Sequence, residues 1–200
     1  MTRTLVLATH NPHKLEELAA ILGPALAGFE LVPTRGPDPI EDGATFAENA
    51  LIKARAAVAH TGLPALADDS GLAVDALGGE PGIRSKRYAG TGVDADNIAL
   101  LLERLEGKGD RSARFVCAAA FVDPDGTELV EVAEFPGDIL LAPVGDGGFG
   151  YDPVFRPDGS GRSLAEYTAE EKNAVSHRAM AFRAIMPAIA AWSSGSAGAR

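Results

Sequence analysis

The 200-residue chain is poor in several features that define particular protein classes. It contains one cysteine, Cys117, so no disulfide can form within the chain, and no cysteine cluster is available for zinc. The apolar surroundings of Cys117 indicate a small buried residue and not a nucleophile. No apolar run approaches the ~20 residues of a membrane helix. These absences exclude a disulfide scaffold, a zinc finger and a membrane-spanning protein.

Positive charge is also scarce. The chain has 18 Lys and Arg against 28 Asp and Glu, which gives a formal net charge of −10 and a pI near 4.8. A protein that grips long nucleic acid through its overall field needs a basic face, so that class is excluded, whereas a small anion shielded by Mg²⁺ remains compatible. The first residues enter a strand pattern instead of a signal peptide, which predicts a cytoplasmic protein.

Two common nucleotide-binding motifs are missing. The chain contains no G-x-x-x-x-G-K-[ST] loop. Glycines 145, 147 and 150 have G-x-G-x-x-G spacing, but residues 151–153 read Tyr-Asp-Pro where a dinucleotide fold would begin a helix, so we reject that match. This glycine segment still presents Phe149, which either offers a face for a stacked base or packs in the core.

Hydrophobic periodicity predicts an α/β fold. The length and composition fit one globular domain or a two-lobed unit. Residues 123–126, Asp-Pro-Asp-Gly, are turn chemistry between two strand-like runs, which implies an antiparallel hairpin in a mixed sheet. Asp94 and Asp96 are expected to cap a helix. We expect strands at 4–8, 65–67, 113–122 and 128–135, helices at 12–22, 45–60, 94–105, 168–175 and 176–192, the last disturbed by Pro187, and a flexible tail at 193–200.

The most informative segment holds adjacent carboxylates, Asp68 and Asp69, at a predicted turn between two apolar runs. Carboxylate oxygens suit a hard cation such as Mg²⁺, and Glu41 belongs to a second acidic turn. Capping of the turn explains Asp68 and Asp69 equally well. A metal together with scattered cations suggests a polyphosphate ligand; the cations are Lys14, Lys53, Lys172 and Arg178.

The first predicted loop also points to an anion. Asn11 is placed as an N-cap and Pro12 as the first helical residue, so Lys14 falls in the first turn, where a cation opposes the helix dipole. A bound anion beside the helix N-terminus would explain this arrangement, and the Thr9 hydroxyl would add a donor. An ordinary capped helix with an exposed lysine is the alternative.

Six segments together resemble the inosine/xanthosine triphosphate pyrophosphatase family over essentially the whole chain. They are residues 9–14, 45–50, 67–72, 79–83, 147–153 and 176–178. Their order and number make chance agreement improbable. The chain departs from the family in having His10 and His13 where members often carry glycine, which changes the bulk of the first loop, while Asn11 and Lys14 are kept.

The resemblance implies a fold, an activity and a set of partners. The fold is a long mixed β-sheet flanked by helices in two lobes, with the substrate cleft between them, and the protein is a homodimer. The activity is Mg²⁺-dependent hydrolysis of ITP, dITP or XTP between the α and β phosphates, which yields the nucleoside monophosphate and pyrophosphate. In the family this reaction removes deaminated purines from the nucleotide pool.

The resemblance also implies residue roles. Asp69 is the general base and a metal-associated carboxylate, Glu41 is the second metal-site carboxylate, and Asp68 supports them. The phosphates contact Thr9, Asn11, Lys14, Lys53 and Ser70. Phe149 stacks on the purine, and base selection falls to Asp152, Lys172, His177 and Arg178. The remaining substrate contacts are His10, Pro12, His13, Gly150 and Tyr151.

Two other functions remain compatible with the sequence. One is a related pyrophosphatase of the Maf-like kind, which acts on pyrimidine or modified nucleotides and is separated by comparing pyrophosphate release from purine and pyrimidine triphosphates. The other is a nucleotide-binding module without turnover. The carboxylates of Glu41 and Asp69 argue against the second option, because a pure binder has little need for a base at the α phosphate.

Overall fold

A computed structural model describes residues 2–9 and 12–195 of the chain. The strands are β1 (Arg3–Leu7), β2 (Phe29–Pro33), β3 (Ala65–Val74), β4 (Ser112–Val122), β5 (Glu128–Ile139) and β6 (Phe155–Pro157). The α-helices are α1 (Pro12–Leu22), α2 (Phe46–Thr61), α3 (Asp94–Arg104), α4 (Ala169–Val175) and α5 (His177–Gly195).

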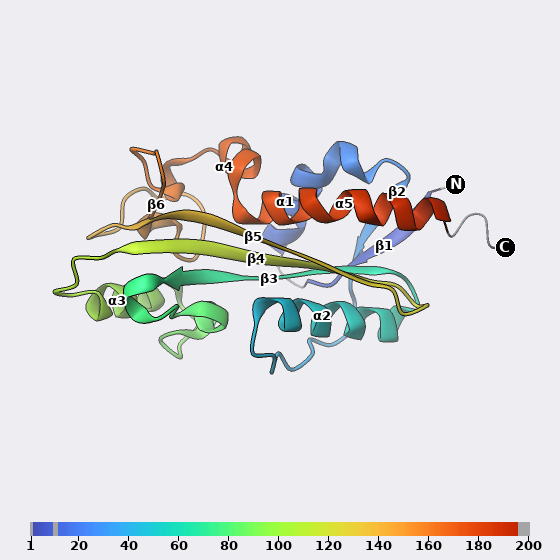
Figure 1. Cartoon of the computed structure of the whole chain (residues 1–200), viewed down its shortest axis with the longest axis horizontal. Helices are drawn as coiled ribbons and strands as arrows, with labels where there is room; N and C mark the ends of the chain where they lie inside the picture. The colour runs from blue at the N-terminus through green and yellow to red at the C-terminus, as the bar shows by residue number, and fades with distance from the viewer. Residues whose placement is uncertain (1, 10–11, 196–200) are drawn as a thin grey trace. The chain divides into compact units, whose positions relative to one another are not determined.

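The strands form one sheet in the order β2-β1-β3-β4-β5-β6 (Figure 1). β1 pairs in parallel with β2 and β3, whereas β5 and β6 are antiparallel. The predicted mixed sheet of an α/β protein is therefore confirmed.

The chain divides into two compact units. Unit 1 comprises residues 1–69, 117–133 and 178–200, and unit 2 comprises residues 70–116 and 134–177. β3, β4 and β5 each contribute residues to both units. Each unit has its own buried apolar residues.

Alternation along β4 creates the layers of unit 1. Cys117 and Phe121 belong to the cluster that includes α1 and α5, whereas Ala118 and Val122 belong to the cluster that includes α2. Successive strand residues point to opposite faces, so α1 and α5 cover one face of these strands and α2 covers the other (Figure 1). The full burial of Cys117 confirms its prediction as a core residue.

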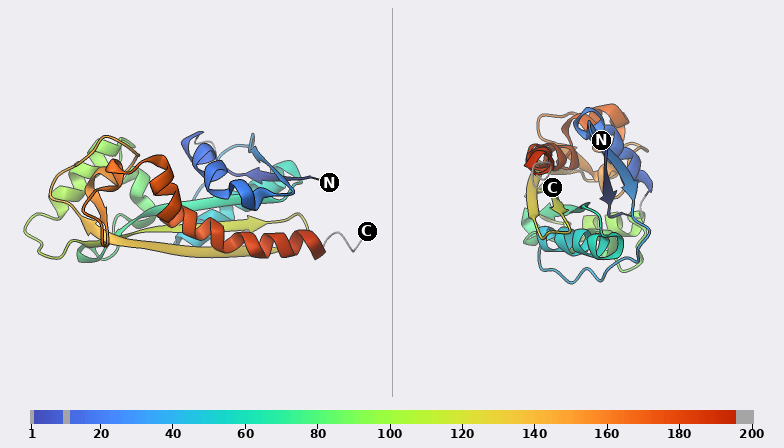
Figure 2. Two further views of the ribbon diagram at one scale, coloured as in Figure 1. Left: turned by 90° about the horizontal axis from the view of Figure 1, so that it is seen from above. Right: turned by 90° about the vertical axis from the view of Figure 1, so that its right-hand side faces the viewer.

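Helix α5 extends three residues beyond its predicted end at Trp192. The hydroxyls of Ser193 and Ser194 donate to the carbonyl of Ala190, which gives that carbonyl side-chain partners near the helix end. α5 runs lengthwise beside the unit 1 strands and contains Pro187 within it (Figure 2). The rest of the predicted tail, 196–200, lies outside the described residues. In the part of the chain that the structure describes, no helix is long and apolar enough to cross a membrane.

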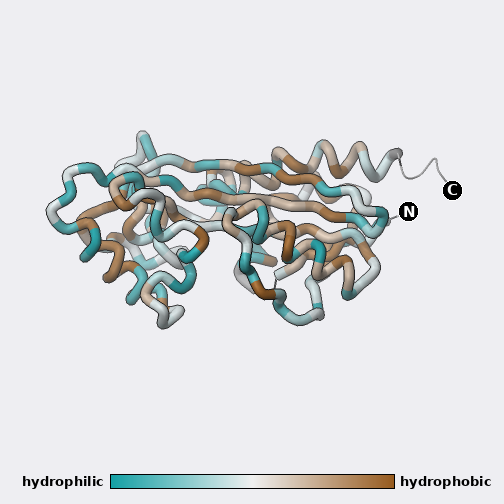
Figure 3. Tube along the Cα trace, turned by 60° about the horizontal axis from the view of Figure 1, so that its bottom comes forward, coloured by the Kyte–Doolittle hydropathy of each residue, from teal (hydrophilic) through white to brown (hydrophobic). Residues whose placement is uncertain are grey.

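Unit 2 packs around aromatic and aliphatic residues. The rings of Phe115 on β4 and Phe155 on β6 lie 4.6 Å apart between centroids, and Ile98 and Leu101 of α3 belong to the same cluster. Along the strands apolar stretches recur, and hydrophilic residues concentrate at the turns that join them (Figure 3). The sheet therefore supplies core to both units.

Local side-chain contacts fix the start of α2 and the loop between β4 and β5. The Thr45 hydroxyl accepts from the Glu48 amide at 3.1 Å and caps α2. In the loop between β4 and β5, Asp123 accepts from the Thr127 amide at 2.9 Å through its carboxylate. Gly126 has a φ of +94°, a region that favours glycine.

The predicted turn at Asp68 and Asp69 is wrong. β3 runs without interruption from Ala65 to Val74 and carries both aspartates within it. β1 pairs with β3 at Ala65 and Leu66, and β4 is its neighbour on the other side, so inclusion in the sheet keeps this acidic, glycine-containing segment extended. The consequence is that the two carboxylates leave the strand in opposite directions.

Truncation of Phe182 tests the unit 1 core. Phe182 is fully buried on α5, so Phe182→Ala should lower the free energy of unfolding by about 3–5 kcal/mol, measured by urea denaturation. Met180→Ala on the same helix is the control, because Met180 is 43% exposed and should cost far less. Equal losses for the two variants would contradict this packing.

Candidate functional site

The site in unit 1 is organised by the alternation of β3. Leu66 belongs to the cluster of α1 and α5, and Ala67 belongs to the cluster of α2. Because side chains alternate with a period of two, Asp68 lies on the same face of the strand as Leu66, and Asp69 lies on the same face as Ala67. The hydrogen bonds agree: Asp68 meets cations from α1 and α5, and Asp69 meets polar groups from α2.

Asp68 lies at the centre of a buried chain of alternating charges, which we call the Asp68 network. The Lys14 ammonium donates to its two carboxylate oxygens at 3.0 and 2.8 Å. The Nε of Arg178 lies 3.4 Å from Asp68 Oδ2, and its Nη1 donates to Glu17 Oε2 at 2.5 Å. Arg178 is only 1% exposed, so these partners replace water around its guanidinium.

The charged side chains of the Asp68 network stabilise one another in their ionised forms. Burial alone would raise the pKa of Asp68, but the Lys14 ammonium and the Arg178 guanidinium outweigh it and hold this pKa far below its usual range. Burial opposes the charge of Arg178 as well, yet Asp68 and Glu17 raise its pKa further above the ordinary value. Asp68 is therefore a fixed anion at neutral pH.

Asp69 belongs to a second group, the Asp69 network. Its Oδ1 accepts from the Lys53 ammonium at 2.9 Å, and its Oδ2 accepts from the Asn49 amide at 3.2 Å. Lys53 also lies 3.3 Å from Glu41 Oε2. Burial raises the pKa of Asp69 above its ordinary value and outweighs the attraction of Lys53. The two neighbouring aspartates therefore differ in proton affinity.

Glu41 and Asp69 fit the requirements of a magnesium site by their donor chemistry. Both carboxylates contact the same Lys53 nitrogen, at 3.3 and 2.9 Å, so they already share one cation. Within residues 2–9 and 12–195, no group of three or more His, Cys, Asp or Glu side chains is arranged to hold a metal. Mg²⁺ is commonly held by one or two carboxylates plus waters and substrate phosphates, which matches this pair.

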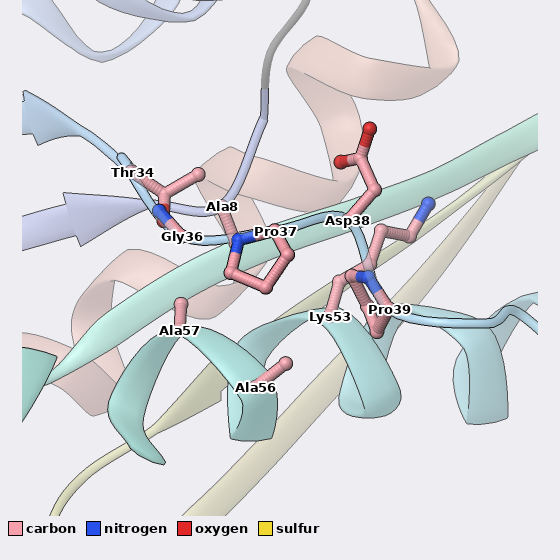
Figure 4. Close-up of a pocket in the computed structure, with 9 residues that line it drawn as sticks. All are labelled: Ala8, Thr34, Gly36, Pro37, Asp38, Pro39, Lys53, Ala56 and Ala57. Atoms are coloured by element: carbon pink, nitrogen blue, oxygen red, sulfur yellow. The ribbon is translucent and has the colours of Figure 1, made fainter. Parts of the chain in front are cut away.

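A small cavity lies beside the Asp69 network. Its volume is about 20 Å³, which suits a water molecule and not a nucleotide. Lys53 from α2 and Asp38 from the preceding loop project on the same side of it (Figure 4). It is lined by Ala8, Thr34, Gly36, Pro37, Asp38, Pro39, Lys53, Ala56 and Ala57.

Unit 2 contains a separate group built around Phe149. The Lys172 ammonium donates to Asp152 Oδ2 at 2.6 Å and lies 4.3 Å from the centroid of the Phe149 ring. The same Asp152 oxygen accepts from the Phe149 amide at 2.9 Å. Asp152 and Lys172 are buried, whereas Phe149 is 39% exposed. Phe149 is therefore not a buried core residue, and one face of its ring meets the Lys172 ammonium.

Glycine is required beside Phe149. Gly148 has a φ of +72°, and a Cβ there would lie 2.1 Å from the Asp152 carboxylate. Tyr151 anchors the other end of the segment, because its buried hydroxyl donates to the Ser85 carbonyl at 2.9 Å. Of the glycines in the rejected G-x-G-x-x-G match, Gly145 and Gly147 approach the backbone of Ala165, where an added Cβ would lie 2.9 and 2.6 Å from it.

The structure groups the predicted residues by unit. Unit 1 brings together Lys14, Glu41, Lys53, Asp68, Asp69 and Arg178. Unit 2 contains Phe149, Gly150, Tyr151, Asp152, Lys172 and His177, and the His177 ring stacks on Phe115 at 4.8 Å. Arg178 was grouped with the base-selecting residues, but its guanidinium lies in the Asp68 network, so base reading by Arg178 stays a prediction.

The first loop is only partly described. His10 and Asn11 lie outside the described residues, and Pro12 and His13 are placed in α1 by their backbone alone. The Thr9 amide donates to the Leu7 carbonyl at 2.9 Å at the end of β1.

Sequence reasoning missed two members of these networks. Glu17 follows Lys14 by three residues and Asn49 precedes Lys53 by four, so each shares a helix face with a predicted cation. That spacing was the available signal.

Ser70, a predicted phosphate contact, directly follows Asp69 within β3.

A mixed sheet with helices on both faces, and buried carboxylates neutralised by lysine and arginine, define an α/β protein with a buried group of paired charges. The Ham1 family model matches residues 5–188, and the chain belongs to this family.

Similar proteins span almost the whole chain. A dITP/XTP pyrophosphatase of Streptomyces coelicolor is 53% identical over 196 residues, which cover 94% of this chain and 98% of the relative. The solved structure of a HAM1 protein from Coxiella burnetii has a TM-score of 0.87 and 41% identity, covering 95% of this chain and 99% of that one. A structure of a dITP/XTP pyrophosphatase from Mycobacterium abscessus has a TM-score of 0.76 and 48% identity, covering 92% and 99%.

Neutralising Asp68 should lower the stability of the folded protein. Asp68→Asn leaves Lys14 and Arg178 without their shared anion, so the free energy of unfolding at pH 7 should fall by about 3–5 kcal/mol. Because the folded-state pKa of Asp68 is lowered, its contribution is fully present above the unfolded pKa of about 4. The difference between wild type and variant should shrink as the pH falls below that value.

The matched control is Glu128→Gln, which removes one carboxylate from the exposed Arg55–Glu128 pair. It should cost about 0–1 kcal/mol. Denaturant unfolding from pH 7 to pH 3 measures both variants. A pH-independent Asp68→Asn penalty, or one no larger than the control, would remove Asp68 from the centre of the network.

Proposed function

We propose that this protein hydrolyses nucleoside triphosphates of deaminated purines, namely ITP, dITP and XTP, to the monophosphate and pyrophosphate. Relatives named dITP/XTP pyrophosphatase, about half identical over nearly the full chain, support this activity. The observation that carries it is the pair of adjacent aspartates in β3, of which Asp68 is a fixed anion and Asp69 has a raised pKa. The family resemblance also leads us to propose a homodimer.

The triphosphate would bind to cations of unit 1. Lys14 lies in the first turn of α1, where ammonium and helix N-terminus both favour an anion. Lys53 is held by Asp69 and Glu41 and offers a second ammonium. Both lysines are partly buried, which strengthens their attraction for phosphate oxygens relative to lysines in free solution.

Asp69 would act as the general base. A water oxygen attacks the α phosphorus, its proton passes to an Asp69 oxygen, the bond to the bridging oxygen breaks, and pyrophosphate leaves. The raised pKa makes Asp69 a better proton acceptor than an ordinary aspartate, and Asn49 and Lys53 fix its orientation. Bound by Glu41 and Asp69, Mg²⁺ would neutralise phosphate charge.

The purine would bind to the Phe149 group of unit 2. The exposed part of the Phe149 ring offers a stacking face, and the buried Lys172 offers a donor beside it. Inosine and xanthine carry an acceptor oxygen at position 6, where adenine carries an amino donor. Donors facing donors would cost about 1–3 kcal/mol for each unsatisfied buried group, which favours deaminated bases. Asp152, His177 and Arg178 are the other proposed selecting residues.

Substituting Asp69 separates binding from turnover. Asp69→Asn keeps the size and one acceptor oxygen of the side chain but removes the base, so kcat for dITP should fall by roughly 10²–10⁴ while the Kd for dITP changes little. Asp42→Asn is the control, since it removes an exposed carboxylate next to Glu41 and should leave turnover unchanged.

The assay measures pyrophosphate against orthophosphate, with Mg²⁺ and a panel of dITP, XTP, ITP, dATP, dUTP and dTTP. Release of pyrophosphate from the first three is the expected result. Normal turnover by Asp69→Asn, release of orthophosphate alone, or preference for the pyrimidines would each refute the proposal.

A further inference from the structure

Asp94 makes a contact that its place in the sequence does not predict. It is the first residue of α3, where an aspartate is expected to serve the helix end, but Val93 occupies the N-cap and no side chain caps the helix. Asp94 Oδ2 instead accepts the amide proton of Gly150, 56 residues later, at 2.7 Å. The carboxylate therefore ties the glycine segment to α3 within unit 2.

This contact completes a clamp on the backbone of Phe149. The peptide plane before its α-carbon is held because the Phe149 amide donates to Asp152 Oδ2 at 2.9 Å. The plane after its α-carbon is held because the Gly150 amide donates to Asp94. Two fixed peptide planes determine φ and ψ of the residue between them, and these angles set the direction in which the ring leaves the chain.

The segment around Phe149 depends on such contacts because it is exposed and rich in glycine. Residues 145–149 are exposed, and Gly148 and Gly150 adopt φ values of +72° and +61°, so the backbone is unusually free to rearrange. The Gly147 amide donates to the Ala165 carbonyl at 3.0 Å, but this contact precedes Gly148 in the chain and does not hold the backbone that follows it. Two contacts hold the peptide that follows Phe149: its carbonyl accepts from the Asp152 amide at 3.3 Å, and its amide, that of Gly150, donates to Asp94 at 2.7 Å, the shorter of the two.

We propose that Asp94 is a positioning residue for base recognition, which acts through Gly150 to hold the Phe149 ring in the orientation that stacks on the purine. This inference rests on the proposed function, because it requires the base to bind at Phe149. Asp94 takes no part in the hydrolysis, so its loss should weaken binding of the base and leave the chemical step intact.

Three variants test the proposal. Asp94→Ala removes the acceptor and should raise KM for dITP roughly fivefold, the effect of one ordinary hydrogen bond, with kcat little changed. Asp94→Asn keeps an acceptor oxygen without the charge and should restore KM close to the wild-type value. Asp96→Ala removes an exposed carboxylate from the same first turn of α3 and should behave as wild type.

Two further readouts distinguish positioning from general destabilisation. Amide hydrogen exchange of the peptide covering 145–152 should be faster in Asp94→Ala but not in Asp96→Ala. In a double-mutant cycle, Asp94→Ala should add little to the KM of Phe149→Ala, because the ring that it positions is already absent.

The outcomes are separable. Unchanged exchange and unchanged KM in Asp94→Ala would overturn the proposal, as would KM effects of Asp94→Ala and Phe149→Ala that simply multiply. Equal KM increases in Asp94→Ala and Asp96→Ala would also overturn it, since helix charge would then be the cause. Absence of pyrophosphate release from dITP by the wild type would refute the proposed function, whereas the exchange measurement would still decide whether Asp94 holds the segment.

Discussion

Successive residues of a strand point to opposite faces of their sheet, and in β3 this alternation separates two adjacent carboxylates. Asp68 meets Lys14 and Arg178, and Asp69 meets Asn49 and Lys53. Neither side chain could be buried as an anion without such partners, because an unpaired buried charge is strongly unfavourable. The position of α1, α2 and α5 against the strands supplies the partners, so the fold and the site depend on the same alternation.

Unequal surroundings give the two aspartates unequal chemistry. Asp68 is enclosed by cations that lower its pKa, which makes it a permanent counter-ion for Lys14 and Arg178. Asp69 is buried with weaker compensation, which raises its pKa and suits a group that accepts a proton. Unit 2 uses carboxylates differently: Asp152 and Asp94 accept backbone amides and thereby shape the segment that carries Phe149.

The regular elements could be predicted because they depend on local signals. α1 was predicted with its observed bounds, and the hairpin loop at 123–127 follows from its turn residues. The continuity of β3 could not be predicted, since acidic residues and glycine favour a turn and only the inclusion of the segment in the sheet keeps it extended. The partners of Arg178 were beyond reach for a similar reason: Glu17 lies 161 residues away in sequence, and no local pattern links the two.

The most direct test measures the carboxyl groups of Asp68 and Asp69 themselves. Side-chain ¹³C NMR, assigned with Asp68→Asn and Asp69→Asn, should show Asp68 ionised well below the ordinary aspartate pKa of 3.8 and Asp69 titrating above it. Addition of Mg²⁺ should shift the Asp69 signal and leave the Asp68 signal in place. The reverse order of the two pKa values, or a Mg²⁺ response at Asp68 and not at Asp69, would contradict the division of roles between the two aspartates.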